Sequence, residues 1–142
     1  MIQRYLSKLS GPLLDRMDLQ VEVSAIPAAE LRDVGTGESS RSIRARVVKA
    51  REKQWARFEG THVYANAQMD ERMVEAYCPL DAKSEAFLLS AMKTLSMTAR
   101  GHHRILKVAR TIADIENLEA ITAQHLAEAI QYRTLDRKLF SP

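Results

Sequence analysis

Basic residues are concentrated in the segment from Ser40 to Phe58, which the sequence predicts to be one long helix. The segment holds seven of the chain's 21 lysines and arginines against a single acidic residue, Glu52. Such a density could follow a nucleic-acid backbone, and Trp55 or Phe58 would offer a surface for base stacking. Because the seven positions spread around the helix, some are expected to be solvated or paired with acidic partners within an assembled ring. The candidate DNA-binding residues are Arg44, Lys49, Arg51 and Lys53.

A second group of basic side chains begins at Arg100, at the start of another predicted helix. Arg100 shares a stripe with His103, Arg104 and Lys107, opposite the apolar face. A phosphate-facing side chain would be well placed there, because the amides and dipole of a helix N-terminus favour anions. The plainer interpretation is an ordinary solvated face. His102 and His103 lack the spacing and partners of a metal site, so no metal site is predicted.

The motifs that bind and hydrolyse a nucleoside triphosphate are absent from the sequence. A P-loop needs G-x-x-x-x-G-K-[ST], so that backbone amides and a lysine wrap the phosphates, and none of the five glycines precedes a lysine. No hydrophobic strand ends in the paired Asp-Glu of a Walker B magnesium site. No nucleophile–base pair or paired carboxylates stand out either. We therefore expect no enzymatic activity and no bound cofactor for this chain alone.

Composition and the single cysteine limit the class of protein. The 142 residues are 46% hydrophobic and 27% charged with a net charge of +3, which suits one domain with a core. No apolar run approaches the roughly 20 residues of a membrane helix, and the first residues do not form a secretory signal. Cys78 has no partner for an internal disulfide, and we expect a buried structural thiol. These features predict a cytoplasmic location and no membrane partner.

Hydrophobic periodicity predicts a mainly helical fold. Residues 19–26 alternate apolar and polar side chains, which is the period of a half-buried strand. Because a lone strand is not stable, we expect residues 1–27 to be disordered or to pack in a non-native way against the helices. The helical patterns cover 40–58, 70–77, 81–95, 98–117 and a last segment from Thr122 towards Leu135, with Asp81 and Thr122 as N-caps.

Four sequence motifs follow one another along the chain in an order that is typical of one protein family. They are SGPLLDRMDL at 10–19, GESS at 37–40 before the basic helix, ARGHHRILKVARTIAD at 99–114, and HLAEAIQYR at 125–133 followed by LDR at 135–137. Together they resemble the C-terminal portion of magnesium-chelatase-like AAA+ proteins of the ComM/YifB group. The resemblance covers nearly the whole chain.

The resemblance implies two unequal parts and a role for three arginines. Residues 1–27 would be the end of the αβα ATPase core with its last strand, and residues 28–142 a helical-bundle lid. Arg16 matches the arginine finger, which reaches the γ-phosphate in the adjacent subunit. Arg100 matches the sensor 2 arginine, which reads the bound phosphate in its own subunit, and Arg104 on the same stripe is a further nucleotide-binding candidate. Without the resemblance, Arg16 is simply a surface arginine between two aspartates.

The function implied is that of a lid fragment from a ring-forming ATPase, commonly a hexamer. A DNA-remodelling motor is favoured, such as one for branch migration during natural transformation. The full-length protein would use ATP and Mg²⁺, and its partners would be its own core, neighbouring subunits of a homo-oligomeric ring, and DNA. The same superfamily contains true magnesium chelatases, so a chelatase label would not be evidence of that activity. The alternative is a free-standing helical adaptor that binds nucleic acid or a protein through its basic helix.

Overall fold

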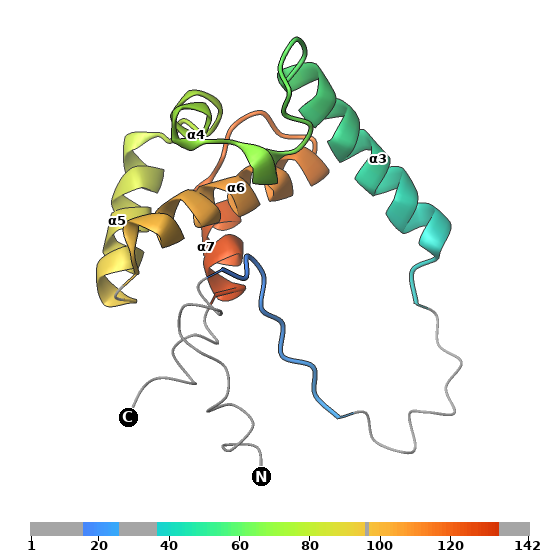
Figure 1. Cartoon of the computed structure of the whole chain (residues 1–142). Helices are drawn as coiled ribbons and strands as arrows, with labels where there is room; N and C mark the ends of the chain where they lie inside the picture. Colours follow the sequence, from blue (N-terminus) through green and yellow to red (C-terminus); the bar gives the residue numbers. More distant parts are fainter. Residues whose placement is uncertain (1–15, 26–36, 96, 134–142) are drawn as a thin grey trace.

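The computed structural model describes residues 16–25, 37–95 and 97–133 (Figure 1). Within these ranges the helices follow one another without an intervening strand. They are α3 (Ser40–Arg57), the short 3-10 helix η2 (Asn66–Gln68), α4 (Glu71–Tyr77), α5 (Ala82–Thr94), α6 (Ala99–Ile115) and α7 (Ala123–Gln131). The predicted mainly helical fold is confirmed, and each predicted helix is present to within a few residues. Leu135, towards which the last helix was predicted to run, lies outside the described residues.

Short polar side chains fix where the helices begin. Ser39 accepts a hydrogen bond from the backbone of Ser42 at 3.2 Å, and Asp81 accepts one from the backbone of Ser84 at 2.7 Å. These contacts satisfy amides that have no partner within their own helix. The hydrogen bond from Ser84 holds the pKa of Asp81 below its usual value. The predicted N-cap positions Asp81 and Thr122 are both confirmed.

Helix α6 is the centre of the bundle. It packs against α3, η2, α4 and α7, while α5 packs against α7 (Figure 1). The apolar stripe predicted for α6 is buried at Ile105, Ala109 and Ile112, and it meets Leu88 of α5 and Leu126 of α7. Truncating such a fully buried leucine to alanine typically costs about 2–5 kcal/mol. This shared core therefore holds the position of α6.

Helix α3 is anchored at its C-terminal half only. Its buried residues are Ala50 and Gln54, whereas Ile43 and Val47 are 42% and 48% exposed. The stripe predicted for this helix thus reaches the core at Ala50 and at Phe58, which follows the helix. In Figure 1 the N-terminal half of α3 extends away from the other helices, in agreement with the exposure of Ile43 and Val47.

The segment predicted as a strand is irregular where the structure describes it. Residues 19–25 form no strand, and Ile26 lies outside the described residues. Val21 and Val23 are 66% and 84% exposed, because the described residues offer no second strand for pairing. The first part of the segment does contact the bundle, since the backbone N–H of Gln20 donates to the carbonyl of Tyr132 at 2.8 Å.

Candidate functional site

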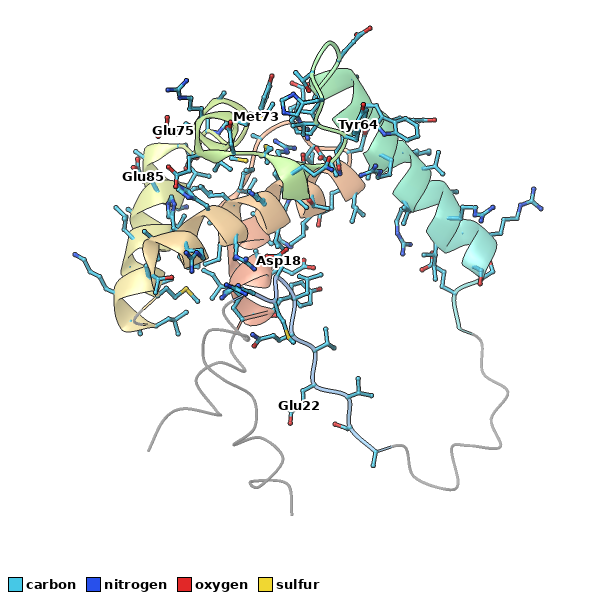
Figure 2. All side chains as sticks on the ribbon, viewed as in Figure 1. Asp18, Glu22, Tyr64, Met73, Glu75 and Glu85 are labelled. Atoms are coloured by element: carbon cyan, nitrogen blue, oxygen red, sulfur yellow. The ribbon has the colours of Figure 1, made fainter. Side chains whose placement is uncertain are left out.

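Arg104 of α6 joins the helical bundle to the segment that carries Arg16. Its Nη1 donates to the backbone carbonyl of Arg16 at 2.5 Å and to Oδ1 of Asp18 at 2.6 Å. The Arg104 side chain is only 21% exposed, and that of Asp18 is 52% exposed. Figure 2 shows Asp18 next to α6. Because donor and acceptor are both charged, the contact to Asp18 is of the stronger class of hydrogen bond.

A second guanidinium fastens the same segment from the end of α7. Nη1 of the buried Arg133 donates to the carbonyl of Met17 at 3.0 Å. With the hydrogen bond from Gln20 to Tyr132, the backbone from residue 16 to residue 20 is held at several points. The side chain of Arg16 stays exposed, since Arg104 engages only its carbonyl oxygen.

Arg100 lies on the first turn of α6, one turn before Arg104. It is exposed, and the helix is capped by Thr98, whose hydroxyl accepts from the N–H of Gly101 at 3.1 Å. Side chains four residues apart on a helix are neighbours. The structure thus brings the Arg16 segment within about one helical turn of Arg100.

The rest of the predicted basic stripe contacts neighbouring elements. Lys107 Nζ donates to the carbonyl of Ala67 at 3.2 Å, and His103 Nδ1 lies 3.7 Å from Glu71 Oε1. Burial, with a smaller effect from His103, lowers the pKa of His102. No cluster of metal-ligating side chains occurs among the described residues. The stripe is therefore only partly a solvated face.

The basic residues of α3 divide into paired and open ones. Arg46 pairs with Glu38 at 2.5 and 2.9 Å, and this contact lowers the pKa of Glu38. Arg51 donates to Gln54 at 3.3 Å and lies 5.8 Å from the ring centre of Trp55. Arg46 therefore has an acidic partner in its own chain, while the predicted pairing within an assembled ring stays a prediction.

An open depression of about 610 Å³ runs between α3 and the end of α6. Arg46, Lys49 and Lys53 line it together with Glu52, while Arg44 is exposed elsewhere on α3. Trp55 is 53% exposed and accessible for stacking. Phe58 is 2% exposed and packs edge-on against Tyr77 at 5.4 Å, so its predicted role as a stacking surface is wrong.

Arg57 belongs to a buried polar network that the sequence did not predict. Its guanidinium binds Asp114 of α6 through two hydrogen bonds, at 2.5 and 2.8 Å, and Asn66 Oδ1 at 2.8 Å. Asn66 Nδ2 in turn donates to Asp114 at 2.8 Å, and Arg110 Nε donates to it at 3.2 Å. The available signal was the four-residue spacing of Arg110 and Asp114, which suits an ion pair on one helix.

Two family models match the sequence. The one described as magnesium chelatase, subunit ChlI C-terminal, covers residues 37–133, and the one described as magnesium chelatase, subunit ChlI, covers residues 1–31. The chain belongs to the magnesium-chelatase-like family. The resemblance inferred from the four motifs is thereby confirmed.

Individual relatives of this magnesium-chelatase-like chain belong to the ComM/YifB group. It is 43% identical to competence protein ComM of Haemophilus influenzae over 139 residues, and this alignment covers 97% of the chain. It is 42% identical over 137 residues, 96% of the chain, to YifB of Escherichia coli. In both cases the chain spans 26% of the relative's length.

The two matched ranges, 1–31 and 37–133, lie on either side of a short gap in this magnesium-chelatase-like chain. The domain boundary after residue 27 stays a prediction, as do the roles of the site arginines. Among the described residues no helix combines the length and apolar character needed to cross a bilayer.

Proposed function

We propose that this chain is the C-terminal lid fragment of a ring-forming AAA+ ATPase whose full-length form remodels DNA. Membership of the magnesium-chelatase-like family supports the first part. The name of the Haemophilus influenzae relative, a competence protein, supports the second, because competence is the uptake of DNA. The full-length protein would bind ATP and Mg²⁺ between its core and this lid, with neighbouring subunits completing each site.

The observation that carries the proposal is the contact between α6 and the Arg16 segment. Two guanidiniums hold the backbone of residues 16–18 on the bundle while the Arg16 side chain stays exposed. Arg100 lies one turn away on the same helix as Arg104 and is also exposed. Both side chains are thus accessible to phosphate, Arg16 to the nucleotide of the neighbouring subunit and Arg100 to that of its own.

The proposed roles of the two arginines come from the resemblance to AAA+ proteins, and their exposure is compatible with these roles. Arg16 is the trans-acting finger that stabilises charge on the transferring phosphoryl group, and Arg100 senses the bound nucleotide. Fingers of this type contribute ~10³–10⁵ in rate. In the full-length protein, Arg16→Ala should therefore abolish ATP hydrolysis with little loss of ATP binding. Unchanged hydrolysis in Arg16→Ala would disprove the proposed role.

The basic helix α3 supplies the candidate DNA contact. Lys49 and Lys53 line the depression beside α6, Arg44 is exposed, and Arg51 lies beside the exposed ring of Trp55. Binding through these side chains would release counterions from the phosphate backbone, so affinity should fall steeply with salt.

Fluorescence anisotropy with a labelled DNA junction and with single-stranded DNA tests the α3 interface. The chain is compared at low and physiological salt with the charge-reversal variant R44E/K49E/R51E. The matched control R72E/K83E/K93E makes the same change in net charge on α4 and α5, where all three residues are exposed. Loss of binding in the α3 variant alone supports the interface. Equal losses of affinity in both variants, or no DNA binding at low salt, would disprove the α3 interface.

The alternative function, a free-standing helical adaptor, is tested by the same DNA-binding experiment but not by the ATP hydrolysis of Arg16→Ala. It predicts binding through α3 without any dependence on Arg16 or nucleotide. A P-loop upstream of this chain in the full-length protein would decide for the motor.

A further inference from the structure

We propose that Arg104 is a positioning residue, which fixes the backbone of Arg16 and so the direction in which the Arg16 side chain points. The inference rests on the proposed function, in which Arg16 acts on the nucleotide of the neighbouring subunit. It assigns Arg104 a task other than the nucleotide contact that the basic stripe predicts.

The geometry places the contacts of Arg104 on both sides of Met17. One nitrogen, Nη1, donates to the carbonyl of Arg16 and to the carboxylate of Asp18. Arg133 holds the carbonyl of Met17 between them, at 3.0 Å. Three consecutive residues are thus each bonded to a guanidinium, one from α6 and one from the turn that follows α7.

Fixing the backbone matters because Arg16 itself has an exposed side chain. A side chain that must meet a phosphate across a subunit boundary gains from a rigid base, and a misplacement of about 1 Å can cost ~10²-fold in rate. Arg104 supplies that base from a helix whose other face is fully buried at Ile105 and Ala109. Arg104 therefore links the rigid core of the bundle to the backbone of Arg16.

The competing role for Arg104 is a direct contact to the nucleotide, as the basic stripe predicts. To bind phosphate, the Arg104 guanidinium would need to leave Asp18, to which it is bonded at 2.6 Å. A residue that binds nucleotide mainly changes KM for ATP. A residue that positions Arg16 for the transition state mainly changes kcat.

Steady-state ATP hydrolysis by the full-length protein separates the two roles. Arg104→Ala should lower kcat about 10–100-fold with KM changed less than about twofold. Arg104→Lys should retain part of the rate, because a lysine nitrogen can still donate to Asp18 or to the Arg16 carbonyl. Arg72→Ala, the loss of an exposed arginine on α4, is the control and should leave both constants unchanged. A raised KM with unchanged kcat in Arg104→Ala would overturn the inference.

Mixed rings test whether the defect lies in the neighbour's site. Subunits carrying Arg104→Ala keep their own P-loop, and subunits with a substituted P-loop lysine keep Arg16 and Arg104. Mixing the two inactive proteins should restore hydrolysis, because the Arg104→Ala subunit then receives a well-placed Arg16 from its neighbour. If Arg104 instead served the nucleotide of its own subunit, mixing would restore nothing.

The Arg16→Ala variant, mixed in the same way, distinguishes failure of the inference from failure of the proposed function. If Arg16→Ala is inactive and is complemented while Arg104→Ala behaves like wild type, only the inference fails. If Arg16→Ala retains full activity or is not complemented, the trans-acting role of Arg16 fails and the inference falls with it.

Hydrogen exchange on the same full-length proteins provides a readout that does not depend on hydrolysis. Arg104→Ala should speed exchange of the Gln20 amide, which donates to the carbonyl of Tyr132, while amides in α6 and α7 remain as protected as in wild type. Loss of protection throughout α6 would show a general folding defect, and Arg104→Lys, with its smaller change, must then show the kcat effect for the inference to stand.

Discussion

Arg57 at the end of α3 forms a two-pronged ion pair with Asp114 near the end of α6. The guanidinium nitrogens lie 2.5 and 2.8 Å from the two carboxylate oxygens. The Asp114 side chain is fully buried and that of Arg57 is 16% exposed. Since α3 buries only Ala50 and Gln54 along its length, this pair is a main attachment of α3 to the bundle.

Removing the charge of Asp114 should destabilise the fold. Asp114→Asn leaves Arg57 and the buried Arg110 without their carboxylate, and breaking a buried pair in this way costs about 3 kcal/mol or more. Urea unfolding at neutral pH measures the loss. Glu38→Gln is the control, because the Glu38–Arg46 pair is exposed and should contribute little. Equal stability of the two variants would show that the buried pair adds nothing.

The same pair predicts a loss of stability in acid. Burial raises the pKa of Asp114, but the hydrogen bonds from Arg57 and Asn66 outweigh it, so the net pKa is lowered. The unfolded chain, with an ordinary aspartate pKa of about 3.9, then binds more protons than the folded one. The stabilisation is present above about pH 4 and is lost as pH falls through the folded pKa.

Urea unfolding from pH 7 to pH 2 checks this dependence. The stability difference between wild type and Asp114→Asn should shrink below about pH 4. Some dependence on acid should remain in the variant, because the pKa of Asp81 is lowered as well. A difference that stays constant over the whole range would contradict the assignment to Asp114.

The thiol of Cys78 should be unreactive in the folded chain. The side chain is buried, and burial raises its pKa to about 11, against the smaller opposing effects of Arg110 and Arg57. Only about one thiol in a thousand is then ionised at pH 8, and the thiolate is the reactive form. A thiol reagent at pH 8 should modify the native chain far more slowly than the urea-unfolded chain. Comparable rates would mean that Cys78 is open to solvent.

The two halves of α3 should differ in hydrogen exchange. The buried residues of the helix, Ala50 and Gln54, and the ion pair of Arg57 all lie in its C-terminal half. Amides with few buried contacts around them open at lower free energy. Mass spectrometry should find faster exchange for residues 44–49 than for residues 51–57. Uniform protection would indicate that something covers the first half.

Local sequence patterns predicted the helices and their starts. Asp81 and Thr122 were identified as caps because a cap depends on atoms within three residues, and the α6 stripe through Ile105 and Ala109 follows from a 3.6-residue repeat. The family, too, could be recognised from four short motifs in order. The caps and the stripe need only neighbouring positions in the chain, and the family needs only the order of the motifs, not their contacts.

The tertiary structure decided which side chains are used for packing and which are left for binding. Phe58 was a candidate for base stacking until the fold buried it against Tyr77. The alternating residues 19–25 could pair only with a strand that the described residues do not contain.

Arg104 and Arg57 show why the sequence did not predict these contacts. Arg104 meets Asp18 across 86 positions of sequence, and Arg57 meets Asp114 across 57. No helical period or capping rule spans such distances. The sequence alone therefore determined the elements and the family of this protein, whereas the pairing of its arginines was decided only when α3 and the Arg16 segment packed against α6.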